Sequence, residues 1–411
     1  MSVVIPRISP VGLGCIRRPS LSCATSLTRR RLNTSSGSRK PVAFAFDIDG
    51  VLKQGSHVLP QAKRTLAVLS GQNKLSQKFP FICLTNGGGS IEATRAQRLT
   101  RELGVEIGEG QVVQSHTIFR GLVPQFEDKP VLVIGGFKDH CRKVAQHYGF
   151  KHVYIPEDVL HWQASVWPFQ KLTEKEVAYA KADVDFSEIS FAAILVFHDS
   201  FNWGRDVQLI CDVLSSSQGV LGTSKLTSEW ESSPQLPVHF SNPDLLWGNE
   251  FSQPRFGQGA FQESVAAVWK RTYNKDLIGT TGGKPTSHTY KYASSLLSHH
   301  VRSLSKPHTH SSSESLHEAV VKSDAGPIEG NVYMLGDNPA SDIAGANAFG
   351  WESILVRTGV FRGDVKDAEH RPTIVKDDVW VSLSVPRASE GENEGQELTP
   401  MAFACILNRK G

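Results

Sequence analysis

The sequence predicts an α/β fold built on mostly parallel sheet, with helices on both faces. From Pro41 onward, short runs of β-branched and aromatic residues alternate with amphipathic segments of helix length, which is typical of such folds. Three of the runs are followed directly by polar residues and glycine. Ligands of open parallel sheets bind at the carboxyl ends of the strands, so we expect a ligand site where these runs end.

Strands are expected where a short apolar run is rich in β-branched or aromatic residues. These runs are Val42 to Phe46, Phe79 to Leu84, Val131 to Ile134, Phe191 to Phe197, Val238 to Ser241, Val332 to Leu335 and Ser353 to Val356. Amphipathic periodicity predicts the helices, which are Pro60 to Ser70, Ile91 to Leu103, Asp139 to Tyr148, Gly204 to Leu214, Phe261 to Tyr273 and Ser287 to Leu297. The Ser- and His-rich stretch 298–326 and the acidic tail 386–411 interrupt this rhythm, and we expect them to be flexible.

The first 40 residues differ from the rest of the chain in charge. They carry eight bases and no acid, leaving 36 bases against 41 acids beyond them. An Arg- and Ser-rich, acid-free leader predicts a mitochondrial transit peptide and delivery to the matrix, with a disordered basic tail as the alternative. The acidic remainder gives no indication of nucleic-acid binding. No run approaches the roughly 18 apolar residues of a membrane span, so we expect no such span.

The strand Val42 to Phe46 ends in Asp47, and Asp49 and Gly50 follow. Because side chains alternate along an extended segment, the two carboxylates point the same way, beyond the end of the strand. Their mutual repulsion calls for a cation, an unusual proton or solvent, and Mg²⁺ is the simplest answer. By itself this motif also fits a solvated turn or a calcium loop.

Three further motifs carry groups suited to phosphate and metal. Thr85, Asn86 and three glycines stand between a strand and a helix, where a hydroxyl and free N–H groups form a phosphate cradle. Lys284 follows two glycines and precedes a helix, so it is a candidate fixed charge for phosphate. Asp337, Asn338 and Asp342 follow the strand Val332 to Leu335. Each also has a purely structural interpretation. The glycines after Asn86 could form an ordinary turn, Lys284 could be a solvated lysine, and Asp342 could stabilise the first turn of a helix.

Taken together and in this order, the four motifs resemble the haloacid dehalogenase superfamily of phosphatases. The resemblance implies a Rossmann-like core and Asp47 as the nucleophile, with Asp49 as general acid and then base. It also implies Thr85, Asn86 and Lys284 as phosphate-binding residues. Mg²⁺ would be held by Asp47, Asp49 and Asp337, with Asp49 contributing its backbone carbonyl, and Asp342 and Asn338 would support this shell.

The spacing of the motifs locates an inserted domain. About 36 residues separate Asp49 from Thr85, but about 200 separate Thr85 from Lys284, too many for a short connection. We therefore expect core residues at 41–115 and 280–385 and a cap at 116–279. This resembles subfamily IIA, whose cap is an α/β domain of the C2 type, and runs such as TNGGGS and SNPDLLWGNE resemble the mitochondrial branch that contains the cat eye syndrome critical region protein homologues.

The cap is expected to select the substrate, because a domain closing over the site excludes water and contacts the leaving group. Asn242 and Asp244, near the end of the cap interval, resemble a motif of the subclass. His198 and Asp199 follow a predicted cap strand and are further substrate candidates. The expected substrate is a small phosphorylated metabolite, and association of two copies through the cap is left open.

Three functional interpretations remain at this point. The first is a Mg²⁺-dependent phosphatase that forms an aspartyl-phosphate. The second is a phosphotransferase or a glycerophospholipid-pathway enzyme, in which a hydroxyl replaces water as acceptor. The third is a weakly active or non-catalytic binding protein, which the presence of every motif carboxylate disfavours.

Overall fold

The computed structural model describes residues 41–380 except 74–75, 306–314, 323–325, 327, 362, 365 and 367. The chain divides into two units, Met1–Arg39 and Lys40–Gly411, and the described residues belong to the second. The predicted leader, the acidic tail and parts of the Ser- and His-rich stretch lie outside the described residues.

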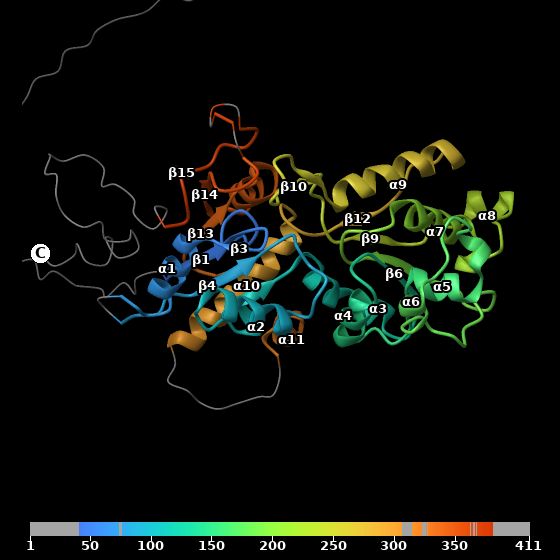
Figure 1. Ribbon diagram of the computed structural model, residues 1–411, viewed down its shortest axis with the longest axis horizontal. Helices are drawn as coiled ribbons and strands as arrows, with labels where there is room; N and C mark the ends of the chain where they lie inside the picture. Colours follow the sequence, from blue (N-terminus) through green and yellow to red (C-terminus); the bar gives the residue numbers. More distant parts are fainter. Residues whose placement is uncertain are drawn as a thin grey trace, which may run out of the picture. The chain divides into compact units, whose positions relative to one another are not determined.

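The first of two main sheets has six parallel strands, in the order β15-β14-β13-β1-β4-β5 (Figure 1). Its strands are β1 (Val42–Phe46), β4 (Phe81–Leu84), β5 (Val112–Val113), β13 (Asn331–Gly336), β14 (Glu352–Val356) and β15 (Ile374–Lys376). Central β1 pairs with β13 on one side and β4 on the other, so that Ala45 stands beside Met334 and Ile82. Segments almost 300 residues apart in sequence thus end at the same edge.

Helices cover both faces of this sheet because its strands are apolar on both sides. Phe44 and Phe46 pack with α1 (Pro60–Leu69) and α2 (Glu92–Leu103) in one buried cluster. Ala43 and Ala45, which point the other way, pack with α10 (Ser287–Ser305) and α12 (Ala344–Phe349).

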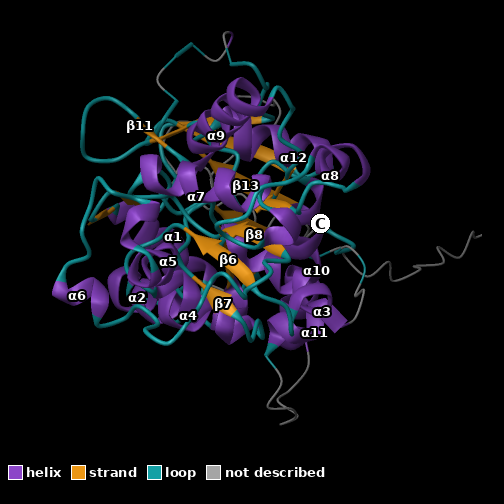
Figure 2. Ribbon diagram, turned by 90° about the vertical axis from the view of Figure 1, so that its right-hand side faces the viewer, coloured by secondary structure: helices purple, strands orange, loops and turns teal. Residues whose placement is uncertain are grey.

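A second parallel sheet has the order β12-β9-β8-β6-β7. Its strands are β6 (Val131–Ile134), β7 (Val153–Tyr154), β8 (Ala193–Val196), β9 (Val238–Phe240) and β12 (Thr280–Thr281). Alternate residues of β6 and β8 pack against α4 (His140–Tyr148) on one face and against α5 (Pro156–Trp162), α7 (Trp203–Ser215) and α9 (Gln258–Tyr273) on the other. Figure 2 shows strands of this sheet between helices.

The other elements are short. Antiparallel hairpins join β2 (Lys53–Gln54) to β3 (His57–Val58) and β10 (Leu246–Trp247) to β11 (Arg255–Phe256). Short α-helices are α3 (Val123–Phe126), α6 (Glu174–Val177), α8 (Thr227–Ser232) and α11 (Leu316–Lys322). The 3₁₀ segments are η1 (Glu109–Gln111), η2 (Ser115–Leu122), η3 (Ala164–Val166) and η4 (Ser217–Gly219), and η5 (Pro339–Ile343) is a π turn.

The predicted fold class is confirmed, and each predicted strand and helix has a counterpart. The stretch 298–326 differs from the expectation of a flexible loop: α10 continues to Ser305 and α11 follows at Leu316. His317 of α11 is buried and contacts Tyr292 of α10 and the Glu109 carbonyl. The polar composition concealed these pairings, because the hydroxyl and the backbone carbonyl that satisfy the buried imidazole are far from it in sequence.

The division at residues 116 and 279 stays a prediction, although the second sheet is drawn entirely from residues 131–281. Strand β12 of that sheet begins at Thr280, just past the predicted end of the cap. Within the described part of the chain, no helix combines the length and the apolarity that crossing a membrane requires.

Candidate active site

The carboxyl edge of the first sheet gathers the predicted acids. Asp47 directly follows β1, is buried, and donates its N–H to the carbonyl of Leu335 at the end of β13 (2.9 Å). Gly50 (φ +90°) then turns the chain, and a Cβ there would lie 2.3 Å from Asp337 Oδ2. Glycine is therefore required both by the left-handed backbone and by the approach of the Asp337 carboxylate.

Lys284 lies at the centre of the acids and is almost completely buried. Its Nζ is 2.6 Å from Asp47 Oδ1 and 2.7 Å from Asp342 Oδ1. Burial alone would lower the pKa of Lys284, but the Asp342 and Asp47 carboxylates raise it well above its ordinary value. The lysine is thus a permanent buried cation.

Asp342 and Asp337 hold the opposite side of this cluster. Asp342 Oδ2 accepts the N–H groups of Asp337 (3.1 Å) and Asn338 (3.0 Å), while Asp337 Oδ2 accepts the N–H of Val360 (2.7 Å). Burial raises the pKa of Asp337 to about 7, and burial raises that of Asp47 well above its usual range despite Lys284.

The donor set fits a divalent cation. Oxygen atoms of Asp47, Asp337 and Asp342 all lie within 4.8 Å of one another, and all three residues are buried. Three carboxylates against one lysine leave excess negative charge in a desolvated site, which a bound cation would offset. Both Asp342 oxygens already accept hydrogen bonds, whereas Asp47 is bonded to Lys284 through Oδ1 and Asp337 to the Val360 N–H through Oδ2. The supporting role expected for Asp342 stays a prediction.

Thr85 and Asn86 follow β4 and line the same cavity as the acids. Thr85 Oγ1 accepts the N–H of Gly87 (2.9 Å). The Asn86 amide is fully used: Oδ1 accepts from Lys284 N (2.7 Å), and Nδ2 donates to Lys284 O and Asp244 Oδ2 (2.9 Å each). The expected contact of Asn86 with phosphate is therefore not favoured for its side chain, which positions Lys284 instead.

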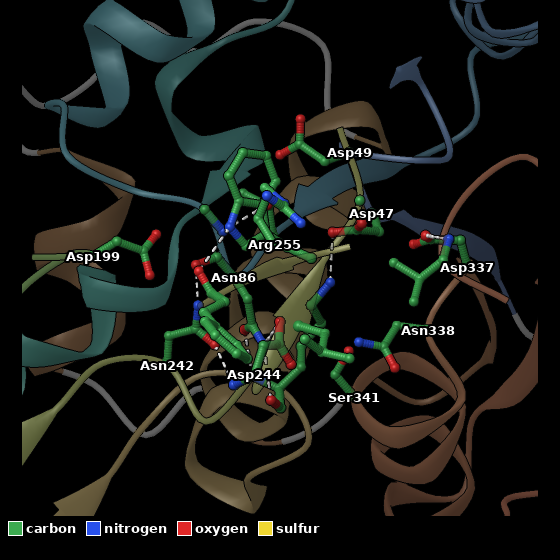
Figure 3. Close-up of a pocket in the computed structure, with 18 of the residues that line it drawn as sticks. Asp47, Asp49, Asn86, Asp199, Asn242, Asp244, Arg255, Asp337, Asn338 and Ser341 are labelled. Carbon is green, nitrogen blue, oxygen red and sulfur yellow. Dashed lines mark hydrogen bonds and ion pairs between the residues drawn. The ribbon is translucent and has the colours of Figure 1, made fainter. Parts of the chain in front are cut away.

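The residues expected from the cap also line this cavity. Asn242 Nδ2 donates to the Asn86 carbonyl (3.1 Å), and Asn242 Oδ1 accepts the N–H of Asp244 (2.8 Å). Burial raises the pKa of Asp244 to about 6. His198 and Asp199 form a pair with Nδ1 3.4 Å from Oδ2. Asn242 and Asp244 thus contact Asn86 directly, as Figure 3 shows.

The cavity has a volume of about 440 Å³ and includes residues that the sequence did not single out. The hairpin β10–β11 contributes Leu246, Trp247, Arg255 and Phe256, and Phe201 follows β8. Their apolar side chains are unusually exposed, from 40% for Trp247 to 71% for Phe256. Two-residue strands leave too short a pattern to detect. The aromatic residues that follow Asn242-Pro243-Asp244 in the sequence could have indicated that this segment lines the site.

A parallel α/β fold with buried carboxylates around a lysine at its strand ends defines a class of hydrolases with a Rossmann-like core. The family model described as haloacid dehalogenase-like hydrolase matches residues 44–151, and one described as HAD-hydrolase-like matches residues 281–382. The interval between them holds most of the second sheet.

Two curated relatives are similar over most of the chain. A mitochondrial hydrolase of Saccharomyces cerevisiae is 37% identical over 346 residues, covering 84% of this chain and 95% of the relative. A cardiolipin synthase (CMP-forming)/mitochondrial hydrolase fusion protein of Schizosaccharomyces pombe is 39% identical over 395 residues. That match covers 93% of this chain but spans only 60% of the fusion protein. The chain belongs to the haloacid dehalogenase-like hydrolases, as the resemblance implied.

Solved structures agree on the fold. A hypothetical protein of Pyrococcus horikoshii superimposes with a TM-score of 0.50 at 20% identity, covering 82% of this chain and 97% of the other. A protein of Cytophaga hutchinsonii described as a possible sugar phosphatase gives 0.50 at 18% identity, covering 82% and 94%.

Proposed function

We propose that this chain is a Mg²⁺-dependent phosphatase that cleaves a small phosphate monoester through an aspartyl-phosphate on Asp47. The observation that carries the proposal is the buried bridge from Lys284 to Asp47 and Asp342, beside Asp337. A fixed cation and a nucleophilic carboxylate are thereby held 2.6 Å apart, which suits electrostatic stabilisation of a transferring phosphoryl group.

In the first step, an oxygen of Asp47 attacks phosphorus and the bond from phosphorus to the leaving oxygen breaks. Asp49 gives its proton to that oxygen, so the leaving group departs as an alcohol. Lys284 neutralises charge on the phosphoryl oxygens, and Thr85 binds them together with the backbone N–H of Asn86. The N–H groups of Gly87 and Gly89 already donate to Thr85 Oγ1 and His116 Nε2. Asp49 lines the same cavity as Asp47.

In the second step, the Asp49 carboxylate takes a proton from water, and the water oxygen attacks phosphorus. The bond from phosphorus to Asp47 breaks, and inorganic phosphate and the free Asp47 carboxylate result. Asp49 is again protonated, so the cycle closes with one water consumed.

Mg²⁺ would be held by the Asp47 and Asp337 carboxylates and by the backbone carbonyl of Asp49. When bound, it supplies positive charge to the phosphoryl oxygens and offsets the repulsion among the acids. Asp342, whose two oxygens are occupied by Lys284 and backbone N–H groups, fixes the backbone at Asp337 and Asn338.

The test is phosphate release from an aryl phosphate by protein lacking residues 1–40. Activity is expected only with Mg²⁺, and Asp47→Asn is expected to abolish it. Asp276→Asn is the matched control, because Asp276 is an exposed partner of Lys270. Undiminished turnover by Asp47→Asn would contradict the nucleophile assignment.

A phospholipid-pathway substrate is the second candidate. One relative carries the matching region fused to a cardiolipin synthase, and the mouth of the cavity exposes Leu246, Trp247 and Phe256, which suit an acyl chain. Comparing phosphate release from glycerol phosphate with release from an acylated glycerol phosphate in detergent distinguishes a small monoester substrate from a phospholipid-pathway substrate. Equal kcat/KM for the two substrates would contradict a role of Leu246, Trp247 and Phe256 in binding an acyl chain. Phosphorylated alcohols among the products would instead indicate phosphotransfer.

We also propose a mitochondrial location, with the matrix as the destination. The support is the acid-free basic leader and the description of both relatives as mitochondrial. Deletion of residues 1–40 is expected to leave a tagged protein in the cytosol, and continued import of the shortened protein would refute the leader assignment.

A further inference from the structure

A chain of buried hydrogen bonds runs behind the candidate active site and joins the two sheets. It begins at Glu92, the first residue of α2, which packs on the first sheet. It passes through Tyr148, the last residue of α4 on the second sheet, and His116 of the intervening segment η2. It ends at the backbone N–H of Gly89. None of these side chains faces the cavity that holds Asp47.

Glu92 is the fixed end of this chain. Its Oε1 accepts hydrogen bonds from Thr117 Oγ1 (2.7 Å) and the Tyr148 hydroxyl, and its Oε2 accepts one from Arg120 Nη2 (3.0 Å). Burial alone would raise the pKa of Glu92, but it is lowered to about 2, with the Arg120 guanidinium and the hydrogen bond from Tyr148 among the causes. A fully buried carboxylate with three donors is a rigid acceptor, because each donor removed would leave charge uncompensated.

The direction of the hydrogen bonds follows from Gly89. Its N–H can only donate, and it points at His116 Nε2 (3.1 Å), so that nitrogen carries no proton. Burial lowers the pKa of His116 to about 4, so the neutral ring has its proton on Nδ1. Nδ1 lies 2.8 Å from the Tyr148 hydroxyl and donates to it, and that hydroxyl donates to Glu92.

Gly89 belongs to the loop that follows Thr85. A Cβ at Gly88 would lie 2.6 Å from His116 Cδ2, and one at Gly89 (φ +84°) would lie 2.6 Å from His198 Cδ2. The loop therefore packs closely between two imidazole rings, those of His116 in η2 and of His198 after β8. Its other end is fixed by the Gly87 N–H bond to Thr85 Oγ1 (2.9 Å) and by Ser115 N–H to the Gly87 carbonyl (3.3 Å).

We propose that His116 is a positioning residue: oriented by Tyr148 and Glu92, it holds the Gly87–Gly89 loop in the conformation that binds phosphate beside Thr85. The same contacts tie α4 of the second sheet to α2 of the first, so loop geometry depends on the placement of the cap. The inference rests on the proposed phosphatase function for its kinetic consequences but not for the contact itself.

The test has one arm that needs no activity. Hydrogen–deuterium exchange of a peptide covering residues 86–91 is compared for wild type, His116→Leu, His116→Gln and Tyr148→Phe. We expect faster exchange in His116→Leu and Tyr148→Phe, and near wild-type exchange in His116→Gln, whose amide oxygen can accept the Gly89 N–H. Tyr154→Phe is the matched control, since Tyr154 is also buried, in strand β7 of the second sheet, and no side-chain hydrogen bond of its hydroxyl is recorded among the described residues.

The kinetic arm uses aryl phosphate and Mg²⁺. Loss of one neutral hydrogen bond corresponds to about a three- to tenfold effect. We expect kcat/KM to fall by about that factor in His116→Leu, chiefly through KM, with weaker inhibition by inorganic phosphate and recovery in His116→Gln. Unchanged exchange at residues 86–91 in His116→Leu would overturn the proposal, whatever the enzyme's activity. So would equal losses in the Leu and Gln variants, which indicate a packing role only. If Asp47→Asn fails to reduce turnover, the proposed function falls while the exchange arm still decides this inference.

Discussion

The Asn86 side chain holds the Lys284 backbone at both of its polar groups, accepting from the N–H at 2.7 Å and donating to the carbonyl at 2.9 Å. The two residues are 198 positions apart. One side chain from the end of β4 therefore fixes the lysine that bridges Asp47 and Asp342.

Replacing this amide is expected to misplace the lysine. Asn86→Ala leaves buried polar groups at Lys284 and Asp244 without partners, at about 1–3 kcal/mol of unfolding free energy. We expect kcat to fall more than KM rises, because Lys284 stabilises charge that grows in the transition state. Urea unfolding and steady-state kinetics measure the two effects. Gln208→Ala, at an exposed amide on α7, is the control, and a wild-type kcat in Asn86→Ala would contradict the assigned role.

Two effects of an alanine at Gly50, the clash with Asp337 and the strain of the left-handed backbone, can be measured separately by comparison with Gly104. Gly50 has φ +90° and Gly104 has φ +75°, but a Cβ at Gly104 meets nothing within 4 Å. Both alanine variants are expected to lose about 1 kcal/mol of stability to the left-handed backbone. Only Gly50→Ala, which pushes on the Asp337 carboxylate, should also weaken Mg²⁺ activation. Titration of activity with Mg²⁺ checks this, and matching midpoints for the two variants would show that Asp337 tolerates displacement.

Asp244 should make stability depend on pH. Burial raises its pKa in the folded state to about 6, above the ordinary 3.8. The folded protein therefore holds this proton over a range where the unfolded chain has lost it. The resulting stability is complete below about pH 4 and is lost as pH rises through about 6, by about 3 kcal/mol at most. Asp244→Asn should remove that part of the decline. Unfolding free energies at pH 4 and pH 6.5 test it, and identical pH slopes would show that Asp244 ionises normally.

The exposed hairpin β10–β11 should govern substrate affinity rather than chemistry. Trp247 lines the cavity but contacts none of Asp47, Lys284 or Asp337 through a recorded polar bond. Trp247→Ala is expected to raise KM for an aryl phosphate about fivefold or more, since a lost aromatic contact is worth about 1 kcal/mol or more, with little change in kcat. Phe169→Ala removes an aromatic side chain that is 82% exposed and outside this cavity, so it should change neither constant. A fall in kcat alone would place Trp247 in the catalytic step instead.

The strands that build the site were predictable because each is a short apolar run buried on both faces. Strands β1 and β6 begin and end where the pattern indicated, and Asp47, Thr85 and Asp337 follow their strands as expected. Antiparallel pairs of two residues, such as β10–β11, gave no usable periodicity. The last turns of α10 and the whole of α11 were hidden by a Ser- and His-rich composition, although Ser298 and His317 are buried.

By itself, the sequence determined the class of fold, the family and the set of acids at the strand ends, because these depend on local patterns and short motifs. Only the tertiary structure showed that the Asn86 side chain bonds to the Lys284 backbone, that Arg255 and Trp247 reach the cavity, and that His116 accepts the Gly89 N–H. Asn86 and Lys284 are 198 residues apart in sequence. The hydrogen bonds of His116 lead through Tyr148 to Glu92, from a helix on the second sheet to a helix on the first. Such pairings are fixed by packing and by the need to satisfy every buried polar group, and no local pattern records them.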